Sequence, residues 1–313
     1  MGASEIEIVE VAPRDGLQNE SAQIATEEKL ALIARAAAYG ARRIEVGSFV
    51  NPRRVPQMAD TEAVVAGLPP RGQRNFSAIG LCLNVRGVHR AIDGRADGVS
   101  GIDEAGCVIV ATDTFGIRNQ GQTVEEGLAA NAAMIELAKS NGMRAQVTIA
   151  ASFGCPFEGA VDPARVTDLA LRLVDAGAEE IALADTIGVA VPAQVHALVS
   201  ALVGRLGVPL RVHLHDTRGM GPANAWAAYQ AGVLLFDASL GGLGGCPFAP
   251  NATGNVATED LAYLFGHGGV GHNIDMGAAI KANHWFERVM GRTLPSRVGR
   301  AGDFEPQREM ESA

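Results

Sequence analysis

A (β/α)8 TIM barrel is the fold class that this sequence predicts, because short apolar runs and helical segments alternate along it. Eight runs rich in apolar and β-branched residues recur over almost the whole chain. Between them lie segments in which apolar residues return every three or four positions, as on the buried face of a helix. Strands that are apolar throughout and alternate with helices build parallel sheets, and eight repeats favour closure into a barrel. A doubly wound open sheet is the alternative, but it would usually have fewer strands or an evident second domain.

The individual elements follow from the same patterns and from residues typical of helix ends. The expected strands cover residues 6–11, 43–47, 76–83, 107–111, 145–149, 180–184, 210–215 and 234–239. Helical character is clearest over residues 26–39, 123–140, 162–175, 192–204 and 219–231. Thr26 is expected to cap the first of these helices, and Asp162-Pro163 has the order expected at a helix start. Gly40 and Gly142 follow helices as expected C-terminal glycines.

The sequence predicts a single barrel domain over residues 1–290, because no linker rich in Pro, Ser or charge precedes about residue 291. Residues 291–313 are polar with Gly and Pro, and they predict a loosely packed C-terminal tail. In a barrel of this kind, catalytic groups lie at the carboxyl ends of the strands and in the loops that follow. A polar residue at a strand end is therefore a candidate site residue.

The composition argues against several classes of protein. A net charge of -9 and a pI near 5.3 argue against a nucleic-acid partner. The absence of about 18 uninterrupted apolar residues argues against a membrane-spanning helix. The N-terminal residues do not resemble a signal peptide, and the four cysteines contain no CxxC pair, so they predict reduced thiols. We expect a cytoplasmic protein.

The basic residues form only short clusters. The longest combines Arg53-Arg54 with Arg42-Arg43, and it is either ordinary surface charge or a means of steering an anion. Because the chain as a whole is acidic, any anionic substrate has to be attracted locally.

Two histidines stand at the end of the seventh expected strand, in His213-Leu214-His215. Alternation along a strand places both imidazoles on the same face, where two inward histidines can bind one metal ion. A pair of hydrogen-bonded core histidines is the other interpretation, so further ligands are needed to decide.

Polar residues also follow the first two expected strands. Asp15 can ligate a hard metal ion or serve as a turn residue, while the planar fork of Arg14 suits an oxyanion or a thioester oxygen. Glu45 stands among apolar neighbours, where a carboxylate needs a partner, and Arg14 is the obvious one. A structural ion pair and a direct catalytic role for Glu45 both remain open.

The later strand ends supply three more candidates. Asp185 follows the sixth expected strand, where it either caps the next turn or orients a site group. The glycine-rich loop after the eighth strand contains Cys246, between Gly245 and Pro247, and this thiol is either a site residue or a free loop cysteine. Asn255 offers an amide oxygen of the type that completes a hard-metal shell.

Several blocks of the chain resemble the hallmark segments of the hydroxymethylglutaryl-CoA lyase family. The longest are Pro13-Arg14-Asp15-Gly16-Leu17-Gln18-Asn19-Glu20, His213-Leu214-His215-Asp216-Thr217 and Gly242-Leu243-Gly244-Gly245-Cys246-Pro247-Phe248. Shorter blocks that agree begin at Val55, Gly154, Asp185 and Thr253. The resemblance covers roughly residues 5–265, and related aldolases and acyl-CoA condensing enzymes lack the cysteine loop.

The resemblance implies a site, a cofactor and partners. It implies a divalent cation, Mg2+ or Mn2+, and an acyl-CoA thioester substrate, with a TIM-barrel fold, a role in leucine degradation and formation of a homo-oligomer. The implied metal ligands are Asp15, His213, His215 and Asn255. Implied catalytic residues are Arg14, Glu45, Asp185, His213 and Cys246, and implied substrate-binding residues are Arg14, Asn84 and Asn119.

The chain also departs from the family pattern. Ser21 replaces a usual Lys, Thr112-Asp113 replaces a Ser-Glu pair, and Gly121 replaces the second Asn of an Asn-x-Asn whose first member, Asn119, is kept. These differences leave open a related substrate, such as citramalyl-CoA or a longer 3-hydroxy-3-methylacyl-CoA. An aldolase acting on a 2-oxo acid and a catalytically silent barrel are two further alternatives.

Overall fold

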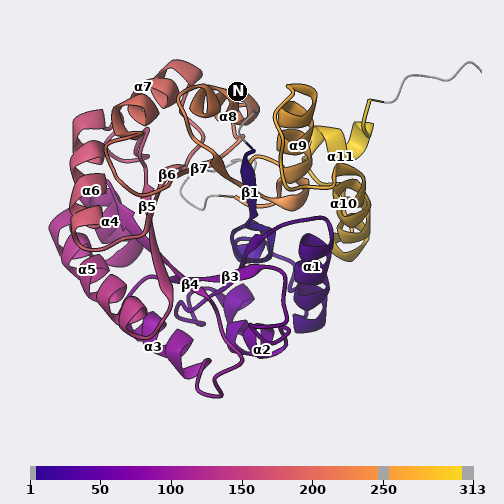
Figure 1. Cartoon of the computed structure of the whole chain (residues 1–313), viewed down its shortest axis with the longest axis horizontal. Coiled ribbons are helices and arrows are strands. Elements are labelled where there is room, and N and C mark those ends of the chain that lie inside the picture. The colour runs from indigo at the N-terminus through magenta and orange to yellow at the C-terminus, as the bar shows by residue number, and fades with distance from the viewer. Residues whose placement is uncertain (1–4, 246–253, 305–313) are drawn as a thin grey trace, which may run out of the picture.

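The computed structural model describes residues 5–245 and 254–304. Eight parallel strands form a closed barrel in chain order, with helices around its outside (Figure 1). The strands are β1 (Glu7–Glu10), β2 (Arg43–Ser48), β3 (Ser77–Cys82), β4 (Glu104–Val110), β5 (Arg144–Ala150), β6 (Glu180–Asp185), β7 (Leu210–Leu214) and β8 (Leu235–Ala238). The predicted TIM barrel and all eight expected strands are confirmed.

The helices include all five that the sequence pattern singled out. In chain order they are α1 (Thr26–Ala38), α2 (Thr61–Ala66), α3 (Val85–Asp93), α4 (Asp113–Gln120), α5 (Val124–Ser140), α6 (Pro163–Asp175), α7 (Pro192–Leu202), α8 (Gly221–Gln230), α9 (Thr258–His267), α10 (Met276–Met290) and α11 (Arg297–Ala301). Asp162 caps α6 as expected, since its carboxylate accepts a hydrogen bond from the backbone N–H of Ala164. The cap predicted at Thr26 is wrong: Ala25 occupies the N-cap position, and the Thr26 hydroxyl instead donates to Asp60.

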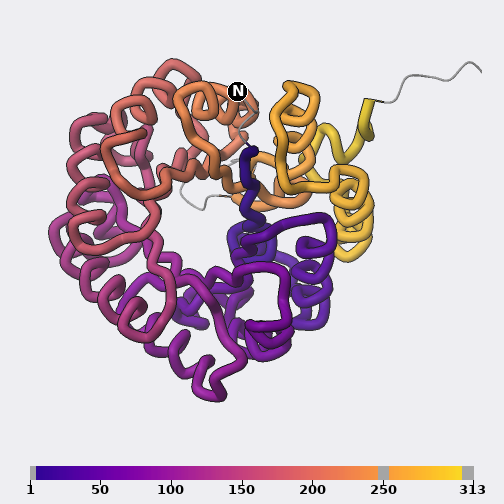
Figure 2. Tube along the Cα trace, viewed as in Figure 1, coloured from indigo at the N-terminus to yellow at the C-terminus, as the bar shows by residue number. Residues whose placement is uncertain are grey.

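The barrel closes where its first and last strands meet. β1 pairs with β8 at four register positions, from Glu7 opposite Leu235 to Glu10 opposite Ala238. In Figure 2 the indigo start of the chain lies beside the orange segment that contributes this last strand. Closure brings residues after β1 next to residues after β8, although about 240 positions separate them in the sequence.

The inside of the barrel carries charge as well as apolar side chains. Arg43 on β2 forms ion pairs with Glu104 on β4, at 2.6 Å, and with Glu180 on β6, at 2.7 Å. Arg211 on β7 joins Glu180, at 3.1 Å, to Asp237 on β8, at 2.9 Å. All five side chains are buried, so the barrel contains a continuous network of opposite charges.

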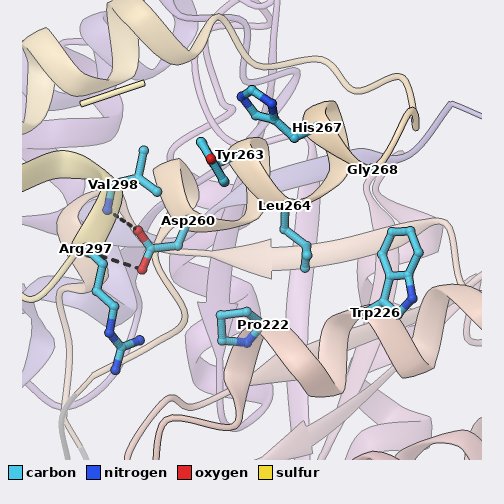
Figure 3. Close-up of a pocket in the computed structure, with 9 residues that line it drawn as sticks. All are labelled: Pro222, Trp226, Asp260, Tyr263, Leu264, His267, Gly268, Arg297 and Val298. Atoms are coloured by element: carbon cyan, nitrogen blue, oxygen red, sulfur yellow. Dashed lines mark hydrogen bonds between the residues drawn. The ribbon is translucent and has the colours of Figure 1, made fainter. Parts of the chain in front are cut away.

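The first part of the expected C-terminal tail is packed against the barrel domain. Leu294 and Ser296 are each 1% exposed, and α11 follows them. Figure 3 shows why: the Asp260 carboxylate on α9 accepts hydrogen bonds from the backbone N–H groups of Arg297 and Val298. The prediction of a loose tail is therefore wrong for residues 294–301, because a helix cap and an apolar anchor hold them.

Over the two described ranges, no helix combines the length and the apolar character needed to cross a membrane.

Candidate active site and metal centre

A cavity of about 170 Å³ opens where the strands end, at the carboxyl-terminal mouth of the barrel. All eight strands, or the loops that directly follow them, contribute to its wall, and Phe115, Asn119 and Gln120 contribute from α4. Arg14, Asp15, Glu45, His213 and His215 all line this one cavity. The structure thus brings together most of the candidate residues found in the sequence.

Three side chains converge as a candidate metal-binding cluster. One ligand atom from each of Asp15, His213 and His215 lies within 4.8 Å of the others. The two ring Nε2 atoms face each other at 3.2 Å, and the Asp15 carboxylate is 3.8 Å from Nε2 of His213. The same-face prediction for the two histidines is confirmed.

Asn255, the fourth expected ligand, adjoins the carboxylate of this cluster. It follows the loop after β8, and its Nδ2 donates to Asp15 at 2.8 Å and to the Leu243 carbonyl at 3.1 Å. Its Oδ1 is buried and has no hydrogen-bond partner among the described residues. A buried amide oxygen without a partner is costly, and a bound cation would satisfy it.

The donor set fits a divalent ion. Two ligand atoms at about 2.1 Å from one ion and at right angles lie about 3 Å apart, close to the observed Nε2–Nε2 separation. Burial and the charge of His213 lower the pKa of His215 to about 4, so this imidazole is neutral near pH 7. Burial raises the pKa of Asp15, but Arg14 and the two histidines hold it well below its usual range, so the carboxylate is ionised. Neutral imidazole and ionised carboxylate are the protonation states that ligation needs.

Arg14 lies beside the cluster, held between two carboxylates. It follows β1 in a tight turn (Ala12–Gly16), where Nη1 donates to Asp15 at 2.5 Å and Nη2 donates to Glu45 at 2.8 Å. The pairing of Arg14 with Glu45 expected from the sequence is present. Burial raises the pKa of Glu45 by more than the charge of Arg14 lowers it.

One residue of this site was missed from the sequence. Asp237 accepts a hydrogen bond from Nδ1 of His213 at 3.0 Å and is also paired with Arg211. This contact leaves Nε2 of His213 free to face the cluster. The sequence contained an indirect signal for such a carboxylate. Arg211 stands two positions before His213 and so shares its inward strand face, where a buried arginine needs an acidic partner.

Asp185 serves the loop after β6. Its carboxylate accepts hydrogen bonds from the backbone N–H groups of Val189, at 2.9 Å, and Ala190, at 3.0 Å. Its neighbours Ala184 and Thr186 line the cavity, whereas Asp185 is not part of the wall. Of the two alternatives left by the sequence, the structure shows the capping contact.

The two asparagines expected to bind substrate lie in different places. Asn119 on α4 lines the central cavity. Asn84 caps α3 through a hydrogen bond from the N–H of Gly87, and it lines a separate hollow on the β2 and β3 side. Cys246 lies outside the described residues, but Gly245, just before it, is part of the cavity wall.

None of the positions that depart from the family pattern lines the central cavity. Thr112 is buried, with its hydroxyl donating to the sulfur of Cys155, and Asp113 accepts a hydrogen bond from the N–H of Val124. Gly121 ends α4 with a φ of 75°, a conformation that glycine adopts without strain. Ser21 is exposed in the loop that follows β1. These residues shape the loops around the mouth rather than the cavity itself.

A second large hollow lies on the outer face, between α8, α9 and α11. Figure 3 shows its wall, which includes Pro222, Trp226, Tyr263 and Leu264. It is mainly apolar and lacks the convergent ligand atoms found at the barrel mouth. The candidate active site is therefore the central cavity.

Known proteins resemble this chain over almost its whole length. Residues 5–285 match the model of a family described as HMGL-like. An (R)-citramalyl-CoA lyase of Chloroflexus aurantiacus is 44% identical over 96% of each chain. A hydroxymethylglutaryl-CoA lyase of Bacillus subtilis is 37% identical over 93% of this chain and 95% of its own length. The structure of an HMG-CoA lyase from Acinetobacter baumannii, in complex with coenzyme A and 3-methylmalate, matches with a TM-score of 0.89 and 36% identity, over 96% of this chain and 97% of that one.

Proposed function

The chain belongs to the HMGL-like family, and from this premise we propose that it is a metal-dependent lyase that cleaves 3-hydroxy-3-methylglutaryl-CoA to acetoacetate and acetyl-CoA. The observation that carries the proposal is the convergence of Asp15, His213 and His215 beside Arg14 in one cavity. The same cavity would take the acyl end of the thioester.

The metal ligands in this proposal are Asp15, His213, His215 and Asn255, and the ion is Mg2+ or Mn2+. Oxygen ligands from a carboxylate and an amide, with two imidazoles, suit such a hard or borderline cation. When bound, the ion supplies Lewis acidity toward the oxygen atoms of the substrate.

Glu45 is the proton acceptor that the geometry favours. The pKa of Asp15 is too low for an effective base, and His213 is committed to ligation, whereas Glu45 lines the cavity and its pKa is raised. Glu45 takes the proton of the tertiary hydroxyl as the bond between C2 and C3 breaks. The electron pair of that bond passes to the acetyl-CoA fragment as an enolate, and the hydroxyl carbon becomes the ketone of acetoacetate.

Arg14 and Cys246 complete the sequence of proton and charge transfers. The Arg14 guanidinium stabilises the negative charge that develops on the thioester oxygen of the leaving enolate. Cys246 then delivers a proton to the enolate carbon, giving acetyl-CoA. Gly245 in the cavity wall supports this assignment, because the cysteine is the next residue in the chain.

Glu45→Gln tests the base. Without an ionisable group at this position, kcat falls by about 10²- to 10⁴-fold, and the rise in rate with pH on the acidic side of the profile disappears. Because burial raises the pKa of Glu45, that rise lies above pH 4.5 in the parent protein. A dependence of kcat on pH with the same shape in the variant as in the parent would show that another residue is the base.

Citramalyl-CoA is a second candidate substrate, favoured by the 44% identity to the (R)-citramalyl-CoA lyase. It lacks the methylene between the tertiary carbon and the free carboxylate, so the same bond cleavage gives pyruvate and acetyl-CoA. Because the bond that is cleaved is the same, either substrate uses the same residues. One methylene in a pocket changes kcat/KM between two such substrates by about 10- to 200-fold.

The deciding experiment measures acetyl-CoA release from both thioesters by the purified protein, with Mg2+ or Mn2+ and with a chelator. Metal-dependent turnover with the larger kcat/KM for the 3-hydroxy-3-methylglutaryl ester supports the proposal, and a larger kcat/KM for citramalyl-CoA moves the assignment to the second candidate. Turnover of a free 2-oxo acid aldol adduct, unaffected by Cys246→Ala, would favour the aldolase alternative. Cytoplasmic location, homo-oligomer formation and a role in leucine degradation stay predictions.

A further inference from the structure

Glu10 is a fully buried acid that none of the proposed catalytic steps uses. It is the last residue of β1, it does not line the central cavity, and no cationic side chain among the described residues forms an ion pair with it. Its carboxylate instead accepts four hydrogen bonds, which compensate for the loss of water around a buried acid. The partners of these bonds indicate what the side chain does.

The two oxygens of this carboxylate serve different parts of the molecule. Oε1 accepts hydrogen bonds from the backbone N–H groups of Ala12, at 2.8 Å, and Leu240, at 2.9 Å. Oε2 accepts hydrogen bonds from the hydroxyl groups of Tyr39, just after α1, at 2.5 Å, and of Thr258, at the start of α9, at 2.7 Å. Oε1 therefore joins the loop after β1 to the loop after β8, and Oε2 joins both to the helices outside the barrel.

The carboxylate stands where the backbone pairing of β1 with β8 stops. Glu10 opposite Ala238 is the last register position, and the last backbone bond runs from the N–H of Val11 to the carbonyl of Ala238, at 2.9 Å. Beyond this point the N–H groups of Ala12 and Leu240 have no acceptor in the sheet, and Glu10 supplies one to both. The side chain thus continues the connection between the two segments for one further step.

The same two loops carry Asp15 and Asn255 farther along. The short turn that starts at Leu240 leads to Leu243, whose carbonyl accepts a hydrogen bond from Nδ2 of Asn255 at 3.1 Å. Asn255 also donates to Asp15 at 2.8 Å. These contacts form a closed ring between the two loops, with Glu10 at one end and two of the proposed metal ligands at the other.

We propose that Glu10 is a positioning residue for the metal site. Its carboxylate fixes the spacing of the two loops, and through them the spacing of Asp15 and Asn255, without touching the metal or the substrate. This inference rests on the proposed function, since it takes these two residues as metal ligands. A functional site needs its groups held within about 0.5 Å of their working positions, and side chains behind the site supply that precision.

Three substitutions separate this role from ordinary packing. Glu10→Met keeps an unbranched side chain but accepts none of the four hydrogen bonds. Glu10→Gln keeps one oxygen for the N–H groups of Ala12 and Leu240, while its amide nitrogen donates to the two hydroxyl oxygens. Tyr39→Phe is the matched control, because it removes one buried hydrogen bond of the same carboxylate and leaves both N–H contacts in place. If Glu10→Met does not fold, Glu10→Asp replaces it, because the shorter side chain keeps the charge but withdraws the oxygens from the two loops.

The first measurement needs no metal. Backbone hydrogen exchange of the metal-free proteins is read by mass spectrometry on peptides that contain Ala12 and Leu240. In Glu10→Met these two amides exchange about tenfold faster or more, relative to the amides of β5, whereas Glu10→Gln and Tyr39→Phe leave this ratio unchanged. An unchanged ratio in Glu10→Met overturns the proposal, and so does an equal rise in Tyr39→Phe.

The second measurement is calorimetric titration of the metal-free proteins with Mn2+, beside thermal unfolding. Glu10→Met binds Mn2+ about 10- to 100-fold more weakly than the parent, while Glu10→Gln and Tyr39→Phe bind it as the parent does. Glu10→Met and Tyr39→Phe both have a lower Tm, so a loss of Mn2+ affinity in both would show general destabilisation and overturn the proposal. A parent protein that binds no divalent cation refutes the proposed function, and hydrogen exchange then decides alone whether Glu10 fixes the two loops.

Discussion

At the scale of single residues, the guanidinium of Arg14 is held between the carboxylates of Asp15 and Glu45. Arg14→Gln removes the charge that stabilises the enolate while leaving Asp15, His213 and His215 in place. We expect kcat to fall by about 10²- to 10³-fold, with a much smaller change in Mn2+ affinity measured by calorimetry. Equal losses of turnover and of metal affinity would contradict the role assigned to this guanidinium.

Asp237 supports the proposed metal centre through its contact with His213. Asp237→Asn weakens the support that keeps Nε2 of His213 facing the cluster, so Mn2+ affinity falls by about 10- to 100-fold. The measurement is calorimetric titration of the metal-free protein with Mn2+, together with thermal unfolding in the absence of metal. A lower melting temperature with unchanged Mn2+ affinity would reduce Asp237 to a packing role.

The sequence was sufficient to bring the proposed ligands together but not to predict the residue that supports them. His213 and His215 could be placed on one face from strand alternation alone, and Arg14 could be paired with Glu45 because a carboxylate among apolar residues needs a partner. Asp237 could not be placed, because its contact with His213 depends on the register between β7 and β8, where these two residues lie directly opposite each other. Register is a property of the closed sheet rather than of either strand.

At the scale of elements, the glycines after β8 allow neighbouring segments of backbone to approach each other closely. A Cβ at Gly254 would lie 2.5 Å from the carbonyl oxygen of Gly242, which no real side chain tolerates. A Cβ at Gly244, where φ is 125°, would meet the amide of Asn255 at 2.6 Å. The described part of this loop therefore packs closely around Asn255.

The start of α9 contributes a buried acid to the same region. Glu259 is fully buried, and its carboxylate accepts hydrogen bonds from the N–H of Gly241 at 3.0 and 3.1 Å. Burial raises its pKa from 4.5 to about 8. The folded protein therefore holds a proton here that the unfolded chain loses above pH 4.5, so the free energy of unfolding falls as the pH rises from about 4.5 to about 8.

Glu259→Gln tests this pH dependence. The variant cannot ionise at this position, so the contribution of Glu259 to the fall in the free energy of unfolding disappears. In the parent this contribution amounts to at most about 5 kcal/mol. Urea unfolding of both proteins at pH 5 and pH 9 measures the difference. The nearby Glu10, whose pKa burial also raises, keeps a residual decline in the variant. Identical declines in the two proteins would show that Glu259 is ionised throughout.

The strands were predicted more accurately than their ends. The expected run 107–111 became β4 (Glu104–Val110), which begins three residues earlier. Glu104 and Gly106 are residues that strands generally disfavour, and their place in β4 depends on tertiary contacts. Glu104 is buried inside the barrel, where its shortest ion pair is with Arg43 from β2, a contact that the local sequence does not contain.

At the scale of the whole molecule, the charged network inside the barrel links five strands. Arg43→Met leaves Glu104 buried without its main partner and removes the shortest of the three ion pairs of Glu180. The free energy of unfolding should fall by about 3 to 5 kcal/mol, as for other broken buried ion pairs. Arg42→Met is the matched control, because Arg42 is exposed and its pair with Glu5 contributes about 0 to 1 kcal/mol. Equal effects of the two substitutions, measured by urea unfolding, would contradict the importance of burial.

The pairing of β1 with β8 has a consequence for how the protein is made. During synthesis, β1 leaves the ribosome more than 200 residues before the strand that closes the barrel against it. Until then its apolar edge has one strand partner at most, and an unpaired edge invites association with other chains. The proposed metal centre is subject to the same delay, because Asp15 and Asn255 stand 240 positions apart and meet only after closure. The ion therefore cannot assist the growing chain, and we expect the nascent protein to depend on chaperones rather than on metal until its last strand has emerged.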